Sequence, residues 1–256
     1  MKRPKSSGPL PRRGLAGAAI ALAGLLALSW FDVLPGAWRL RGLVLGREGR
    51  ETWLRERHAA ARHDLFAHEN RSVPAGMVVF LGSSTVERFP LERCFPGRPA
   101  LNRGVDGDTV PMLLEHLGRT IPPAAPAAFV LGIGGNDLRR EGASPAAICA
   151  RYARLLDRLA ALHPGVPVAM LGLYPVHDTR GERLRRMRVL NGLLAELART
   201  RGAAFVATDR PPLSSPAGPL AEVYRADPYH LDAAGYEHLA RWIVADGGAA
   251  AALLAP

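Results

Sequence analysis

The stretch Val78-Val79-Phe80-Leu81-Gly82-Ser83-Ser84-Thr85 decides how this sequence is interpreted. Its first four residues are apolar, and they are β-branched, aromatic or leucine, which predicts a short buried strand. Gly82 permits a sharp turn where that strand ends. In open α/β sheets, ligands bind just beyond the carboxyl ends of the strands. A serine in this place therefore stands where a nucleophile would stand.

The composition limits the size of the core and the kinds of partner and cross-link that the chain can have. The chain has 256 residues, 48% of them hydrophobic, which suffices for one sizeable core and a short extra segment. Five of its cations precede the first acidic residue, Asp32, and no basic run is interleaved with aromatics, so a nucleic-acid partner is not expected. Two cysteines, Cys94 and Cys149, make neither a disulfide framework nor a metal site, although one disulfide could form in an oxidising compartment.

The N-terminal region has the pattern of a membrane segment. Residues 1–13 are basic, and residues 14–31 are uncharged and rich in alanine and leucine. As a helix the second segment would be roughly 27 Å long, close to a bilayer core of ~30 Å. Positive charge before it predicts a cytoplasmic N-terminus and a domain outside the cytoplasm. We expect an uncleaved membrane anchor, or a secreted protein if cleavage occurs at Ala27-Leu28-Ser29.

The rest of the chain divides into three segments. Residues 32–73 are predicted to form a linker and an amphipathic helix, with Leu54, His58, Ala61 and Leu65 on one stripe. Residues 74–247 alternate strands and helices, which predicts a parallel sheet with helices on both faces. The alanine-rich tail, 248–256, is expected to fray. The strands are predicted at 78–82, 99–102, 127–132, 166–173 and 203–207.

Four polar turns carry the chemistry of the predicted domain. Three of them follow predicted strands, and the fourth precedes the last predicted helix. They are Gly82-Ser83-Ser84, Asn102-Arg103-Gly104, Gly134-Gly135-Asn136-Asp137 and Asp227-Pro228-Tyr229-His230.

These turns contain the parts of a nucleophilic active site. A serine reacts only when a neighbouring base takes its proton, and His230 can be that base. Asp227, three residues earlier, can accept the imidazole N–H and hold the ring in place. Attack on an acyl carbon creates an oxyanion, which needs donors. The backbone N–H groups of Ser84 and Gly104 and the side-chain amide of Asn136 could supply them.

Together the four turns resemble the motif blocks of the SGNH hydrolases, also called the GDSL lipase/acylhydrolase family, over roughly residues 75–245. The segment Leu231-Asp232-Ala233-Ala234-Gly235-Tyr236 is also similar to what the family carries after its histidine. The resemblance implies a flavodoxin-like three-layer α/β/α sandwich with strand order 2-1-3-4-5, and neither metal nor organic cofactor. It also implies that Ser84, Asp227 and His230 form the triad, and that Gly104 and Asn136 complete the oxyanion hole.

The first block departs from the family pattern. The family usually carries aspartate before the nucleophile and leucine after it, where this chain has Ser83 and Thr85. Ser83 is therefore the alternative nucleophile, although its place in the block favours Ser84. A catalytically silent protein of the same fold, binding a cell-envelope ligand, is the alternative function. The presence of both Asp227 and His230 favours the enzyme.

The expected reaction is cleavage of a carboxylic ester through an acyl-enzyme. Outside the cytoplasm, the substrate would be a small acyl ester or an acylated glycan or lipid, with O-acetyl groups of envelope polysaccharide preferred because no long apolar lid is visible. Ser83, Arg103 and Asp106 are candidate substrate contacts. His177 is another, because it follows the fourth predicted strand.

Overall fold

The computed structural model describes residues 23–24, 37–176, 181–214 and 224–256, which fall into two units, Met1–Arg57 and His58–Pro256. Helix α2 (Ala37–Glu69) starts within the segment expected to be a linker, and its regular backbone is interrupted at Gly46. The expected membrane segment, 14–31, lies outside the described residues except for two positions. Within the described ranges, no helix is long and apolar enough to cross a membrane.

The second unit is built on five parallel strands in the order β2-β1-β3-β4-β5. This order confirms the prediction, and each strand lies within two or three residues of its expected limits. The strands are β1 (Val78–Gly82), β2 (Ala100–Gly104), β3 (Ala128–Gly132), β4 (Val168–Leu171) and β5 (Ala204–Val206).

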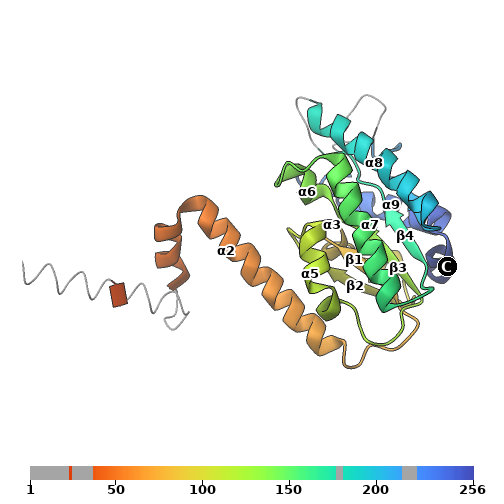
Figure 1. The fold of residues 1–256 in the computed structure, drawn as a ribbon, viewed down its shortest axis with the longest axis horizontal. Helices are drawn as coiled ribbons and strands as arrows, with labels where there is room; N and C mark the ends of the chain where they lie inside the picture. Colours follow the sequence, from red (N-terminus) through yellow and green to blue (C-terminus); the bar gives the residue numbers. More distant parts are fainter. Residues whose placement is uncertain (1–22, 25–36, 177–180, 215–223) are drawn as a thin grey trace, which may run out of the picture. The chain divides into compact units, whose positions relative to one another are not determined.

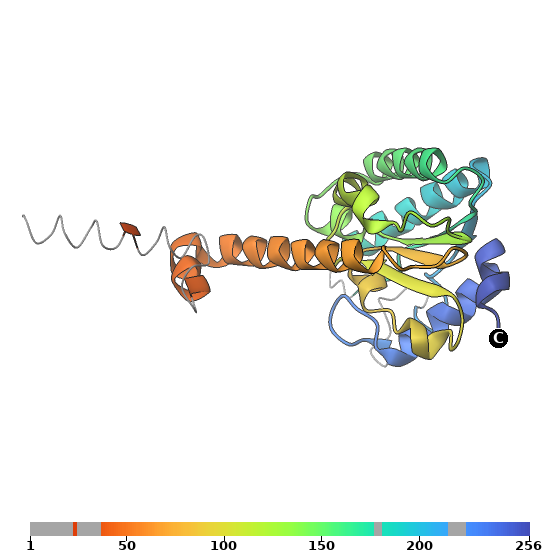
Figure 2. The ribbon, with the colours of Figure 1, turned by 90° about the horizontal axis from the view of Figure 1, so that it is seen from below.

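Helices cover both faces of the sheet, so the domain has three layers (Figures 1 and 2). Alternate strand residues enter opposite cores, with Val79 and Leu81 on one side of β1 and Val78 and Phe80 on the other. The first core is closed by α5 (Val110–Thr120), α7 (Pro145–Leu162) and α8 (Glu182–Thr200). The second is closed by α4 (Leu91–Cys94), α9 (Ala233–Asp246) and α10 (Ala249–Leu254).

Two segments differ from the sequence-based expectation. The alanine-rich tail does not fray: it forms α10, which buries Ala250 and Leu254 in the second core. In α2, Leu54 and Leu65 of the predicted stripe are 46% and 42% exposed, while His63 and Phe66 are buried. The inward face of α2 is therefore rotated away from the leucines, towards residues that pack beside β2.

Three glycines lie side by side at the carboxyl ends of the central strands. Gly82 is in register with Gly104 on one neighbouring strand and with Gly132 on the other. The short helix α3 (Ser84–Glu87) packs directly against them. A Cβ on Gly104 would lie 2.1 Å from the backbone N of Glu87, and one on Gly82 would lie 2.2 Å from the carbonyl oxygen of Gly132. We call these residues the glycine floor, because side chains there would push α3 away.

We expect Gly82→Ala to lower the free energy of unfolding by about 1–3 kcal/mol, the usual cost of overpacking. The matched control is Gly118→Ala in α5, where an added Cβ meets nothing within 4 Å. That change should stabilise the protein by roughly 0.5–1 kcal/mol, because alanine favours a helix. Urea unfolding followed by circular dichroism measures both, and an unchanged midpoint for Gly82→Ala would contradict the close packing of α3.

Candidate active site

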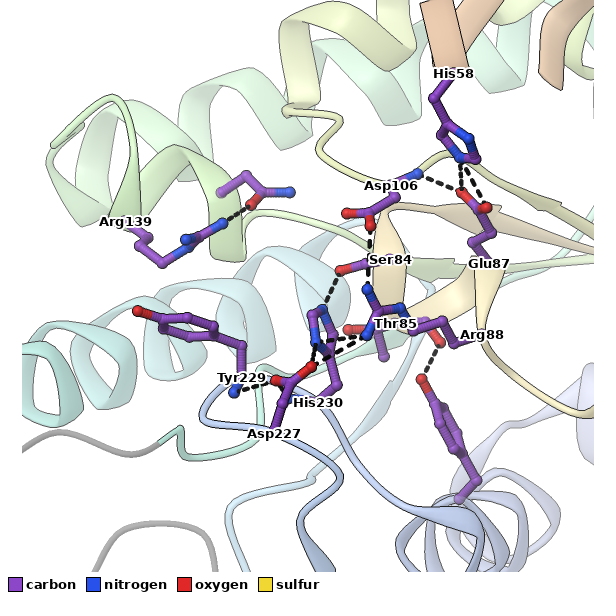
Figure 3. Close-up of polar contacts among 12 residues, drawn as sticks. His58, Ser84, Thr85, Glu87, Arg88, Asp106, Arg139, Asp227, Tyr229 and His230 are labelled. Carbon is purple, nitrogen blue, oxygen red and sulfur yellow. Dashed lines mark hydrogen bonds and ion pairs between the residues drawn. The ribbon is translucent and has the colours of Figure 1, made fainter. Parts of the chain in front are cut away.

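The structure brings Ser84, His230 and Asp227 into one chain of hydrogen bonds (Figure 3). Ser84 begins α3, and the other two residues lie in the loop that precedes α9. His230 Nε2 lies 2.9 Å from Ser84 Oγ, and His230 Nδ1 lies 2.7 Å from Asp227 Oδ2. This is the geometry in which a base can take the proton of a serine while a carboxylate orients the base.

The loop holds Asp227 as an ionised orienting group. Its Oδ1 accepts hydrogen bonds from the backbone N–H groups of Tyr229 (2.8 Å) and His230 (3.0 Å). Partial burial by itself would raise the pKa of the Asp227 carboxyl. The hydrogen bonds from the His230 ring and the Tyr229 backbone outweigh that effect and lower the pKa to about 2. Asp227 therefore keeps its charge throughout the neutral range.

Arg88, at the end of α3, also contacts this group of residues. Its Nη1 lies 2.8 Å from His230 Nδ1 and 3.3 Å from Asp227 Oδ2, and its Nη2 donates to Asp106 Oδ2 at 3.2 Å. A guanidinium can only donate, so Nδ1 cannot at once accept from Arg88 and donate to Asp227. The two contacts favour opposite tautomers of His230. Sequence reasoning missed Arg88. It named Asp106 as a substrate contact, which stays a prediction, and here Asp106 is bonded to Arg88.

The geometry contradicts the expectation that Gly104 offers a free N–H. That N–H donates to Asn102 Oδ1 at 3.0 Å, because Gly104 lies within β2 underneath α3. Asn136 fits its expected place better, since it lines the cavity beside Ser84. Its Nδ2 donates to the carbonyl of Asp108 at 2.9 Å and its Oδ1 accepts from Arg139 at 3.1 Å, which leaves one amide N–H.

Gly107 differs from Gly104 in having an N–H that no described residue accepts. It has a positive φ of 88°, and its carbonyl accepts a hydrogen bond from Arg140. Among the described residues, no acceptor is found for the N–H of Gly107 or for that of Ser84. Gly107 follows β2 by only three residues, and in the structure its positive φ distinguishes it from Gly104.

A cavity of about 100 Å³ opens beside Ser84. Ser83, one of the candidate contact residues, lines it together with Ser84. Its walls are mostly apolar and come from the strand ends, α6 (Gly135–Arg139) and α8. The apolar lining includes Ile133, Leu138, Leu173, Leu184 and Met187. His177 lies outside the described residues, so its expected contact is not described.

Arg103 is not a substrate contact. Its side chain is 1% exposed, and it points away from the site towards the end of α2. There its guanidinium donates to Glu69 Oε2 (2.7 Å) and Asn70 Oδ1 (2.8 Å) and lies over the ring of Phe66. A buried guanidinium needs such partners, so Arg103 fastens α2 to β2.

The described residues contain no cluster of histidine, cysteine and acidic side chains that could hold a metal ion. Cys94 and Cys149 are both free, so the disulfide considered from the sequence is not formed.

Asp108 is a buried carboxyl group that sequence reasoning did not single out. It directly follows Gly107, its side chain is buried, and neither carboxyl oxygen has a hydrogen-bond partner among the described residues. Burial, helped by the negative charge of Glu87, raises the pKa of Asp108 to about 7.

This pKa predicts how Asp108→Asn changes stability with pH. Because the folded pKa lies above the unfolded value of about 3.9, ionised Asp108 destabilises the folded state as pH rises from about 4 to 7. Asp108→Asn should therefore raise the free energy of unfolding by up to about 4 kcal/mol at pH 8, at 1.36 kcal/mol per pKa unit, and by only about 0.5 kcal/mol at pH 4, where the unfolded carboxyl is half ionised. Chemical denaturation at both pH values measures the difference. An equal gain at both values, or a like gain for Asp157→Asn at the surface, would contradict the assignment.

The fold and the serine–histidine–aspartate arrangement define a class of α/β hydrolytic proteins, and the comparisons with known proteins agree. The model of the GDSL-like lipase/acylhydrolase family matches residues 80–238, and the chain belongs to that family. This confirms the resemblance seen in the sequence and supports ester hydrolysis as the general activity. No curated protein matches the chain.

Solved structures of related proteins share the fold. A Streptococcus pneumonia protein, provisionally described as a platelet activating factor, is 26% identical with a TM-score of 0.68, and the match covers 75% of this chain and 94% of that one. A GDSL-like lipase from Bacteroides thetaiotaomicron is 20% identical with a TM-score of 0.62, covering 71% and 94%. An acetylxylan esterase from Geobacillus stearothermophilus is 14% identical with a TM-score of 0.54, covering 69% and 96%.

Proposed function

We propose that this protein is a serine esterase that cleaves a carboxylic ester through an acyl-enzyme on Ser84. The observation that carries the proposal is the chain of hydrogen bonds from Ser84 through His230 to Asp227, with links of 2.9 and 2.7 Å. Family membership supports hydrolysis of esters in general. The apolar cavity beside Ser84 offers a place for an acyl group.

The reaction has two halves. In the first, Ser84 Oγ attacks the ester carbonyl carbon while its proton moves to His230 Nε2, and Asp227 stabilises the imidazolium. The tetrahedral intermediate collapses, His230 gives the proton to the leaving alkoxide, and the acyl group stays on Ser84. In the second, His230 takes a proton from water, the resulting hydroxide attacks the acyl carbon, and the proton returns to Ser84 Oγ as the acid leaves.

Three donors would stabilise the oxyanion in this scheme. They are the backbone N–H of Ser84, the remaining amide N–H of Asn136, and the backbone N–H of Gly107 in place of Gly104. The reactive tautomer of His230 carries its proton on Nδ1, so the contact of Arg88 with Nδ1 is given up during catalysis. Arg88 then keeps its bonds to Asp106 and Asp227.

The substrate and location are proposed on separate grounds. A cavity of about 100 Å³ suits a short acyl group better than a long chain. The basic start and the uncharged segment 14–31 support an extracytoplasmic domain, anchored or secreted. We therefore place acetyl esters of envelope glycans first among the substrates. A neighbour in fold is an acetylxylan esterase, which agrees with that choice.

Replacement of the nucleophile tests the proposal. Ser84→Ala should lower kcat for 4-nitrophenyl acetate by at least about a thousandfold, because the reaction loses its attacking atom. Ser83→Ala is the matched control and should keep kcat within about tenfold. Stopped assays of the purified full chain, together with fluorophosphonate labelling of Ser84, give the two readouts.

Two outcomes would contradict the proposal that Ser84 is the nucleophile of an esterase. Loss of activity in Ser83→Ala alone would mean that the neighbouring serine is the nucleophile. An inactive, unlabelled wild-type protein would favour the silent protein that binds an envelope ligand.

A further inference from the structure

The charged side chains on the cavity beside Ser84 have one sign. Among the described residues that line the cavity, Arg139 and Arg183 are the charged ones, and no carboxylate lines it. Arg139 ends α6, and Arg183 lies in the first turn of α8. The cavity therefore combines an apolar interior with two positive charges.

Both arginines converge on one aromatic ring. The guanidinium carbon of Arg139 lies 4.6 Å from the ring centroid of Tyr229, and that of Arg183 lies 5.8 Å from it. Tyr229 directly precedes His230, is 36% exposed and lines the same cavity. The two cations are thus held together next to the residue that serves as the base.

Neither guanidinium has a carboxylate partner among the described residues. Arg139 donates to the neutral amide oxygen of Asn136, and Arg183 has its ring contact with Tyr229. Arg88 and Arg151, two other arginines near the site, each contact two carboxylates. Two positive charges held on one ring repel each other. An anion placed between them would relieve it.

We infer that the cavity binds esters that carry a second, anionic group, which Arg139 and Arg183 hold beside Tyr229 while the ester carbonyl lies at Ser84. The inference deepens the proposed esterase function and rests on it. The planar fork of a guanidinium matches the oxygens of carboxylate and phosphate, so these are the groups expected. Because Arg139 also bonds Asn136 Oδ1, an anion bound there fixes the amide that faces the oxyanion.

Matched substrates test the inference on the purified full chain. Mono-4-nitrophenyl adipate against 4-nitrophenyl hexanoate places the charge on the acyl side, and 4-acetoxybenzoate against its methyl ester places it on the alcohol side. The wild type should prefer the anionic member of at least one pair by about tenfold in kcat/KM, as expected for one charge-assisted contact. Substituting 4-acetoxyphenyl phosphate tells phosphate from carboxylate.

Replacing one arginine gives the specific readout. Arg183→Met should reduce to about unity the ratio of kcat/KM for the anionic ester to kcat/KM for the neutral ester, both measured in the same variant. Arg185→Met is the matched control, because it removes the same charge from an exposed position on the same helix. Equal rates on charged and neutral esters in the wild type would overturn the inference, as would equal loss of preference in both variants.

A binding measurement separates this inference from the esterase proposal. Calorimetry of 4-acetoxybenzoate with the Ser84→Ala variant needs no nucleophile, and affinity should fall about tenfold when Arg183→Met is added. Binding that depends on Arg183, together with an inactive wild type, would overturn the esterase function alone. Ser84-dependent hydrolysis without binding that depends on Arg183 would overturn the anion site alone.

Discussion

The close approach of α3 to the ends of β1, β2 and β3 is the constraint on which the site depends. That approach requires glycine at 82, 104 and 132, where side chains would collide with backbone atoms or with Val86. With α3 in this place, Ser84 stands at its first position with an N–H that has no acceptor among the described residues, and Arg88 at its end reaches the loop of His230. The proposed nucleophile, one proposed oxyanion donor and a contact of the proposed base thus depend on the packing of one short helix.

Charge is divided between two sides of the site. On the base side, the carboxylates of Asp227 and Asp106 share the single guanidinium of Arg88, so negative charge predominates among these three residues. On the cavity side, Arg139 and Arg183 carry positive charge without carboxylate partners among the described residues. The negative side favours the imidazolium that forms on His230 in the proposed reaction, and the positive side favours an anionic group on the substrate. Each of these two charges thus faces groups of opposite charge.

Much of this arrangement could be predicted from the sequence, because strand–helix alternation fixes a parallel sheet and short polar turns mark the strand ends. The meeting of Ser84, Asp227 and His230 was predicted from the residue types of these turns and from the resemblance to the family. Gly104 and Gly107 could not be told apart, because only the fold shows which N–H is already bonded. The inward face of α2 was also missed, since a buried histidine and a buried Arg103 carry no hydrophobic signal.

The glycine floor has a consequence for how such a cavity can diversify. Gly132 of the floor lines the cavity, and a Cβ added there would lie 2.9 Å from Val86 of α3, two residues from Ser84. Other parts of the lining are side chains of α8, such as Leu184 and Met187, whose size can change. Substitutions in α8, in evolution or in the laboratory, can therefore change which ligand the cavity prefers while the residues at the strand ends stay the same.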